Sequence, residues 1–299
     1  MVKRSVVPRD LPYILEQLSH VARQLGRPAV PVIVARYLGP SARAWLEDRD
    51  ASYVDATGNV FIRVDSPALF LRDRGADRDP WRGPGRPRGT LKGPPAARVV
   101  RALVDFAPPV TVPELVRRSG ASTGATYRVV EFLEQEALIE RRPRGPITAV
   151  SWRRLIERWS WDYGFQRDNR VESYLDPRGL QPLLERLARA TELRYVVTGS
   201  LAARQFTSYA PARLAMIYVD DVPGAAAKLD LRPVDIGANV LLAEGEYDVV
   251  FDRPVEIDGI RYAALSQTAV DLLTAPGRGP AEAEALLDWM ETHERQWRR

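Results

Sequence analysis

The residues best suited to chemistry in this sequence stand at the start of one predicted helix, residues 123–136. Apolar residues recur along this stretch at helical spacing, so they form one buried stripe. The opposite face at the helix start carries small, hydroxyl and basic side chains. In a DNA major groove an Arg can bond guanine through two hydrogen bonds, and a helix N-terminus attracts phosphate. The predicted DNA-contacting residues of this helix are Ser122 (its expected N-cap), Thr123, Gly124, Tyr127 and Arg128.

Two shorter predicted helices precede this one and would position it. The first covers residues 96–106 and is stopped by the two prolines at 108–109. Thr111 is an expected N-cap for the second, residues 112–118. Gly120 then follows where a tight turn needs an unhindered residue.

After the third helix the sequence predicts a β-hairpin. Residues 138–142 and 147–152 are short β-rich runs, and the turn between them carries Arg144 near its tip. In this order the elements resemble a winged helix-turn-helix of bacterial regulators, including a Leu-Glu-x-x-x-Leu-Ile-x-Arg run at 133–141. The resemblance implies that Arg144 contacts DNA phosphate. The alternative is a winged helix that packs only against protein.

Length, charge and cysteine content narrow the function classes. The chain has 299 residues, 45% of them hydrophobic, which is enough for two or three domains. It has no cysteine, which excludes disulfides and thiolate metal sites. Residues 1–152 hold 24 basic against 16 acidic side chains, whereas residues 153–299 hold 19 against 23. This asymmetry favours a nucleic-acid-binding front half joined to a sensing or protein-binding back half.

No hydrophobic run approaches the roughly 18–20 residues that a membrane helix needs. The first ten residues also lack the apolar core of a signal peptide. The sequence therefore predicts a cytoplasmic protein without membrane contact.

The N-terminal stretch reads as a small α/β domain, residues 1–75. It has a predicted amphipathic helix at 11–25, a strand at 30–35, a helix capped by Ser41 and three strands at 53–56, 60–64 and 69–71. This order resembles the half-size core of the restriction-endonuclease-like, or PD-(D/E)xK, superfamily.

That resemblance implies an Asp, followed on the next strand by a carboxylate and a Lys that together hold Mg²⁺ and the attacked phosphate. Asp55 supplies the first group, but Phe61 and Arg63 stand where the others belong. We therefore expect a degenerate domain without catalysis. In it Asp55 and Asn59 would bond local backbone around Gly58. Such a domain can still bind DNA or a partner, with nuclease activity as the alternative.

A linker rich in Gly, Pro and Arg is predicted at residues 76–95. Its Gly-Arg-Pro core at 85–87 resembles the centre of an AT-hook, which lays Arg side chains into a narrow minor groove. Arg86 and Arg88 are therefore candidate DNA contacts. The alternative is a solvated linker that touches phosphates without reading bases.

The C-terminal part, residues 153–299, contains a predicted strand, a Gly-Ser turn at 199–200, a helix and a second strand at 214–219. This run resembles the opening of the nucleotidyltransferase-like fold. The resemblance implies phosphate binding by the Gly-Ser pair and an Asp-x-Asp metal site on the second strand. That strand has no carboxylate until Asp220 and Asp221, which would point to opposite faces. Asp248 and Asp252 lie on or beside a further predicted strand, residues 247–251, as remnants of a third ligand.

The back half as a whole resembles the AbiEi-type antitoxin family, in which a winged helix precedes a transferase-shaped domain without its metal site. The resembling run continues through residues 261–265, 267–273, 276–279 and 281–294. Members repress their own genes and counteract a nucleotidyltransferase-type toxin. Only the DNA-binding role is carried over, because the first 95 residues exceed the short antitoxin pattern.

The sequence thus predicts an α+β, multidomain chain: a restriction-endonuclease-like α/β domain, a central winged helix-turn-helix at 96–152 and a nucleotidyltransferase-like α/β domain. We expect a sequence-specific regulator of transcription that binds double-stranded DNA, with no catalytic residue, metal or cofactor. A toxin or other protein, or a second copy, would bind through the C-terminal domain. The competing classes are a metal-dependent nucleotidyltransferase or nuclease and a protein-binding adaptor.

Overall fold

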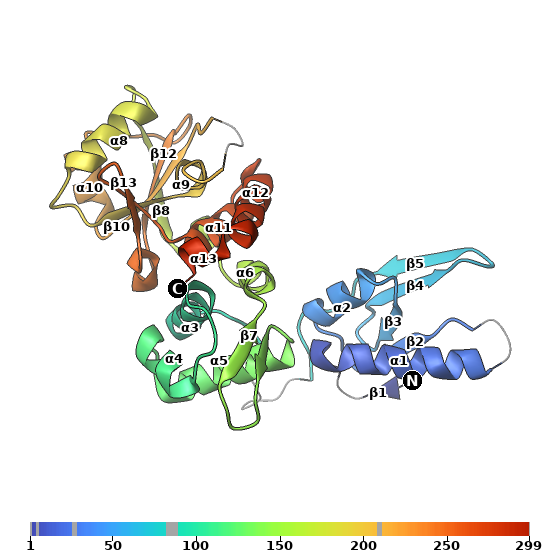
Figure 1. The fold of residues 1–299 in the computed structure, drawn as a ribbon. Helices are drawn as coiled ribbons and strands as arrows, with labels where there is room; N and C mark the ends of the chain where they lie inside the picture. The colour runs from blue at the N-terminus through green and yellow to red at the C-terminus, as the bar shows by residue number, and fades with distance from the viewer. Residues whose placement is uncertain (1, 4–5, 26–28, 82–88, 208–210, 299) are drawn as a thin grey trace. The chain divides into compact units, whose positions relative to one another are not determined.

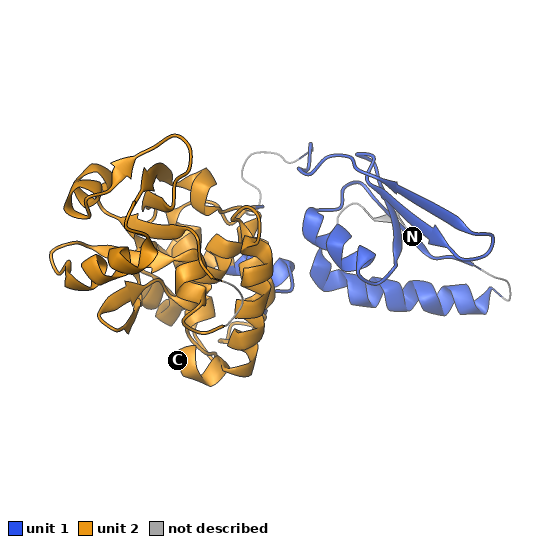
Figure 2. Ribbon diagram, turned by 90° about the horizontal axis from the view of Figure 1, so that it is seen from above, with its two compact units in different colours: residues 1–89, 130–141 blue, residues 90–129, 142–299 orange. Residues whose placement is uncertain are grey.

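The computed structural model describes residues 2–3, 6–25, 29–81, 89–207 and 211–298. Over these residues the chain is a mixed α and β protein with three sheets (Figure 1). It divides into two compact units, coloured separately in Figure 2: Met1–Gly89 with Val130–Arg141, and Thr90–Val129 with Arg142–Arg299. Each unit is described by itself.

The first unit contains a five-stranded sheet with strands in sequence order. The first three strands run parallel and the last two join antiparallel. The strands are β1 (Val2–Lys3), β2 (Val32–Ala35), β3 (Ser52–Asp55), β4 (Val60–Val64) and β5 (Leu69–Asp73), and the helical elements are η1 (Pro8–Asp10), α1 (Leu11–Gln24) and α2 (Pro40–Glu47). Their shared core includes Leu11, Ile14, Ile33, Tyr53 and Phe61.

Two local expectations for this unit are wrong. Helix α2 begins at Pro40 with Gly39 as its N-cap, not after Ser41, because a proline fits the first helical turn without losing a hydrogen bond. The apolar stripe of α1 is buried only at its start. Val21 and Leu25 near its end are 53% and 51% exposed, so nothing in the described chain covers them.

The elements of the predicted winged motif, most of them in the second unit, follow the predicted order. Helix α3 begins two residues early, because Pro94 and Pro95 form its first turn. Strands β6 and β7 form a two-stranded sheet, shorter than expected. The elements are α3 (Pro94–Asp105), α4 (Val112–Ser119), α5 (Thr123–Gln135), which passes into the first unit after Val129, β6 (Ile139–Arg141), which belongs to the first unit, and β7 (Ile147–Val150).

A seven-stranded sheet forms the C-terminal part of the second unit (Figure 1). Its strand order is β11-β8-β12-β10-β9-β14-β13. Its strands are β8 (Arg170–Leu175), β9 (Tyr195–Thr198), β10 (Ala215–Val219), β11 (Arg232–Pro233), β12 (Val240–Glu244), β13 (Val255–Ile257) and β14 (Ile260–Tyr262). Strand β10 is buried along its whole length, parallel to β12 and antiparallel to β9.

Helices cover both faces of this sheet. Residues of α8 and α10 join the core on one face, and α7 and η2 contribute to the core on the other. The helical elements are α6 (Trp152–Ser160), α7 (Phe165–Asp168), α8 (Leu180–Arg189), α9 (Gly199–Ala203), α10 (Val222–Lys228), η2 (Asp248–Phe251), α11 (Leu265–Leu273), α12 (Gly279–Thr292) and α13 (Glu294–Trp297).

Two expectations for this part are also corrected. The run 247–251 is not a strand: Asp248–Phe251 forms the 3-10 helix η2, and Val249 and Val250 are both buried. Successive strand residues would have pointed to opposite faces. The Gly-Ser pair is not a turn before a helix starting at residue 201, because Gly199 and Ser200 already form the first turn of α9.

Helix α3 is tied to the C-terminal part by buried arginines. Arg101 is 2% exposed, and its guanidinium donates to Asp105, to Gln267 and to the backbone carbonyls of Val249 and Asp252. Arg298 donates to the carbonyls of residues 103 and 104 at the end of α3. These bonds fix the helix that begins the winged motif.

Candidate nucleic-acid interface

Local capping builds the turn before α5. The Thr111 hydroxyl accepts a hydrogen bond of 3.3 Å from the Glu114 N–H at the start of α4, which confirms the predicted N-cap. Gly120 ends α4 in the left-handed conformation, with φ of 62°, a region that a side chain would strain. The Thr111 cap and the Gly120 turn could both be predicted because each involves residues close together in the sequence.

The first two turns of α5 present the predicted contact face to solvent. Ser122 Oγ accepts a 3.4 Å hydrogen bond from the Ala125 N–H. Ala125, Thr126 and Val129 are buried on the other side. The exposed residues at the start of the helix are Ser122, Thr123, Gly124, Tyr127 and Arg128.

Two of these side chains are large enough to reach into a groove. Tyr127 is 48% exposed. Arg128 Nη1 lies 3.5 Å from the position where residue 124 would carry a Cβ, so Gly124 leaves room for the guanidinium. Within the described chain, Arg128 has no acidic partner. The structure therefore brings the predicted α5 residues together on one open surface.

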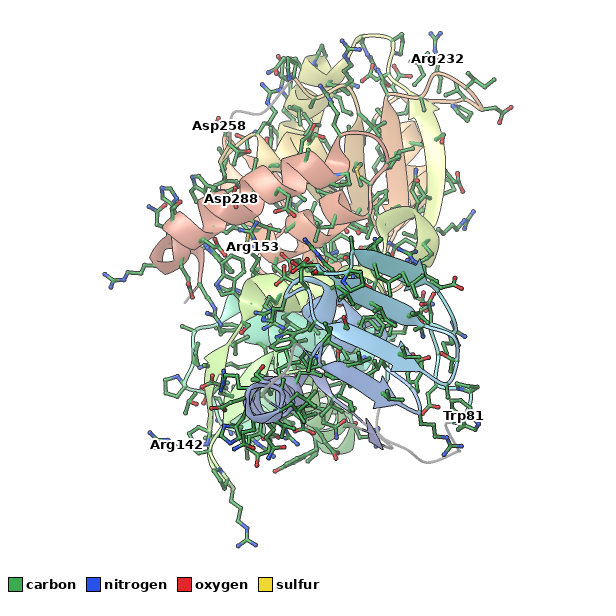
Figure 3. All side chains as sticks on the ribbon, turned by 90° about the vertical axis from the view of Figure 1, so that its right-hand side faces the viewer. Trp81, Arg142, Arg153, Arg232, Asp258 and Asp288 are labelled. Carbon is green, nitrogen blue, oxygen red and sulfur yellow. The ribbon has the colours of Figure 1, made fainter. Side chains whose placement is uncertain are left out.

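The wing turn carries two exposed arginines. Its ends are held by a 3.1 Å hydrogen bond from the Arg142 N–H to the Pro146 carbonyl, and the Gly145 N–H donates to the Arg142 carbonyl at 2.8 Å. Arg144 has a positive φ of 56°, which turns the chain at the tip. Figure 3 shows the Arg142 side chain directed away from the wing.

Sequence reasoning missed three features of this surface. It treated Arg142 as a strand residue, although its position beside the turn could have marked it as a second wing cation. It also left out Arg117, an exposed cation near the end of α4. Val110 forms a β-bridge with Ile147 that extends the wing, and no local signal marks it. Arg86 and Arg88 lie outside the described residues.

The prediction for the turn around Gly58 is confirmed for Asp55, which bonds local backbone, but it is wrong for Asn59. The Asn59 side chain accepts from Arg43 and from the Gly75 N–H and donates to the Ala76 carbonyl, all distant in sequence. Asp55 accepts hydrogen bonds from the N–H and hydroxyl of Thr57, from the backbone and amide of Asn59 and from the Leu38 N–H. Burial raises the pKa of the Asp55 carboxyl, but these hydrogen bonds outweigh it and hold the pKa below its usual value. Phe61, at the expected carboxylate position, is 6% exposed and stacks on Tyr53.

In the C-terminal sheet, the carboxylates that we considered as metal ligands do not lie at the end of β10 that is near the Gly-Ser pair. Strand pairing places Met216 opposite Thr198 and Val219 opposite Tyr195. Asp220 therefore lies beyond the Tyr195 end of β10, four residues and about 13 Å along the strand from Met216 at about 3.3 Å per residue, whereas Ser200 follows Thr198 at the other end.

An arginine stands between two of these acids. Arg194 donates to Asp220 at 3.1 Å and to Asp248 at 2.7 Å, and it lies over the Phe251 ring. The guanidinium thus neutralises the pair that we considered as a remnant of a metal site. Among the described residues, no group of three or more His, Cys, Asp or Glu side chains could hold a metal ion.

A buried acid lies between the sheet and α11. Asp271 accepts hydrogen bonds from the Thr198 hydroxyl at 2.6 Å, the Tyr218 hydroxyl at 2.9 Å and the Gln267 amide at 2.9 Å. Burial raises the pKa of Asp271 to about 6, against the lowering effect of these hydrogen bonds. Gln267 also accepts from Arg101, so the network reaches α3.

A pocket of about 140 Å³ opens near the predicted nucleotide position. Its apolar lining includes Met216 and Leu241 from adjacent strands, and Ser200 also lines it. Arg213 and Glu282 also line it. Strand β10, on which the transferase resemblance implies carboxylates, carries only buried apolar and tyrosine side chains.

No protein-family model, curated protein or solved structure matches this chain. None of the described helices combines the length and the apolar character that crossing a membrane requires.

Replacing Asp271 by Asn tests the buried acid. Because its folded pKa of about 6 lies above the usual value of 3.8, the stability that it contributes is fully present below about pH 4 and is lost as the pH rises through 6. The Asp271→Asn variant should remove this dependence, which amounts to about 1–3 kcal/mol. Urea unfolding of both proteins from about pH 4 to 7, followed by tryptophan fluorescence, measures it; parallel stability curves would contradict the raised pKa.

Proposed function

We propose that this protein is a non-catalytic, sequence-specific regulator of transcription that binds double-stranded DNA and is of AbiEi antitoxin type. In this proposal a degenerate restriction-endonuclease-like domain (1–75), an Arg-rich linker (76–95), a winged helix-turn-helix (96–152) and a nucleotidyltransferase-like domain (153–299) follow one another in a cytoplasmic chain. The proposal is based on one observation: the exposed residues at the start of α5 lie beside a wing that carries exposed arginines.

The unpaired arginines of the motif favour DNA as its ligand. Arg117, Arg128, Arg142 and Arg144 are exposed, and within the described residues none of them has an acidic partner. Arg118 differs, because it pairs with Glu114. Cations that are free of internal ion pairs can neutralise phosphates without first breaking a contact.

Salt dependence tests the phosphate contacts. If these four arginines each neutralise one phosphate, the logarithm of the binding constant should fall with the logarithm of salt concentration with a slope of about −3 to −4 per protein chain. Fluorescence anisotropy on labelled duplexes between low and moderate salt measures the slope. Duplex that is not retained even at low salt would favour the alternative of a protein-binding adaptor.

Two arginine substitutions separate base reading from phosphate binding. Arg128→Ala should cost about 1–3 kcal/mol of discrimination among sequences selected from a random pool. Arg144→Ala should weaken all duplexes alike and reduce the salt slope by about one. Arg118→Ala, which removes a paired cation of the same motif, is the matched control. Unchanged sequence preference in Arg128→Ala would show that α5 does not read bases.

We further propose that neither transferase nor nuclease activity is present. In support, Phe61 fills the place of one required acid, and Arg194 neutralises Asp220 and Asp248. Mg²⁺ at such sites needs carboxylate oxygens close to octahedral geometry. Incubation of the full chain with labelled nucleotides, RNA or DNA and Mg²⁺ or Mn²⁺ should give no product. Product formation that is lost in Asp55→Ala, or in Asp220→Ala and Asp248→Ala, would restore the enzyme alternative.

The C-terminal domain is the proposed site for a protein partner, either a toxin or a second copy of this chain. An adjacent gene that encodes a nucleotidyltransferase-like toxin would support the antitoxin assignment. Co-purification of the two proteins would test the contact directly.

A further inference from the structure

The 140 Å³ pocket of the second unit has an apolar interior. Phe165, Met216, Leu241 and Leu272 line it, and Phe165 and Leu272 are almost completely buried, at 1% exposed each. Pockets for drug-sized ligands measure about 300–1,000 Å³, so this one suits a smaller molecule. Its interior favours an aliphatic or aromatic side chain over a polar one.

One buried carboxylate in this pocket lacks a close partner among the described residues. Glu282 is 4% exposed, and its nearest cation there is Arg278 Nε at 3.8 Å, which is too long for a hydrogen bond. A carboxylate that faces a pocket and accepts no hydrogen bond from its own chain needs a donor from water or from a ligand. The carboxylate of Glu282 is therefore positioned to receive a cationic donor from a ligand.

The mouth of the pocket carries the opposite charge. Arg213 is exposed and, within the described chain, has no ion pair. Arg278 donates to the Pro211 carbonyl at 3.3 Å, in addition to its long contact with Glu282. Two guanidinium groups at the rim can bind a carboxylate through paired hydrogen bonds.

We propose that this pocket binds a small zwitterion with an apolar side chain, that is, an apolar α-amino acid. Its ammonium group would donate to Glu282, and its carboxylate would accept from Arg213 and Arg278. Its side chain would pack against Met216 and Leu241. A nucleotide fits less well, because the buried Glu282 carboxylate repels phosphate and the volume is small.

The site adjoins the buried network that holds α3. Leu272 follows Asp271 on α11, and the Phe165 ring packs against Tyr218 with centroids 5.1 Å apart. A ligand that fills the pocket would pack against Leu272 and Phe165 and so stabilise the second unit. This consequence is independent of DNA binding, so the two proposals can fail separately.

Calorimetry and thermal melting of the full chain with leucine, methionine and phenylalanine test the proposal. We expect saturable binding at one site and a raised melting temperature. Isoamylamine, which lacks the carboxylate, and 4-methylpentanoate, which lacks the amine, should each bind at least about tenfold more weakly than leucine. Equal binding of these analogues, binding of ATP instead, or no binding by any amino acid up to about 10 mM would overturn it.

Variants locate the site. Glu282→Gln and Arg213→Ala should each weaken leucine binding at least about tenfold. Arg213 is exposed, so its replacement keeps the fold even where a change at the buried Glu282 does not. Arg232→Ala, an exposed arginine on β11 away from the pocket, is the matched control and should leave binding unchanged. Unaltered affinity in Arg213→Ala would overturn the assignment.

Discussion

The second unit depends on the hydrogen bonds that the buried guanidinium of Arg101 donates. A charge removed from water needs acceptors for its N–H groups, and it finds one carboxylate, one side-chain amide and two backbone carbonyls. The two carbonyls belong to Val249 and Asp252, in and directly after η2. In a paired strand those carbonyls would accept from a neighbouring strand. Here both carbonyls accept hydrogen bonds from Arg101 instead. This agrees with the 3-10 helix η2, which forms where the sequence pattern predicts a strand.

The same network explains why polar residues lie inside a sheet domain whose sequence looks apolar. Gln267 accepts a hydrogen bond from Arg101 and donates one to Asp271. Asp271 also accepts hydrogen bonds from hydroxyl groups on β9 and β10. Asp105 accepts from both Arg101 and Ser266. Each member satisfies a neighbour, so the removal of one leaves a buried group unpaired. Helix α3 is therefore joined to the C-terminal part of the unit by buried hydrogen bonds.

The elements of the winged motif were predictable from sequence because their signals are local. Thr111, Ser122 and Gly120 act on backbone groups within three or four residues, and the spacing of apolar residues fixes which side of α5 is exposed. What stayed hidden depends on distant partners. The pairing of Val219 with Tyr195, which removes Asp220 from the predicted nucleotide position, is a matter of register that no single stretch encodes. The same is true of Arg194, whose two acid partners come from separate elements.

Net charge alone understates the difference between the two ends of the second unit, because pairing decides which cations remain available. Arg153 on α6 is surrounded by acids on its own helix and on α12, including Glu284 at 2.6 Å and Asp288 at 2.7 Å. Figure 3 labels Arg153 and Asp288. The charge of Arg153 holds two helices together, and the surplus acids leave that surface negative. Arg142 on the wing carries the same formal charge, but within the described chain it has no acid to neutralise it. The acids around α12 and the unpaired arginine on the wing therefore give this unit an uneven surface charge, which would orient it toward the proposed DNA ligand by the wing.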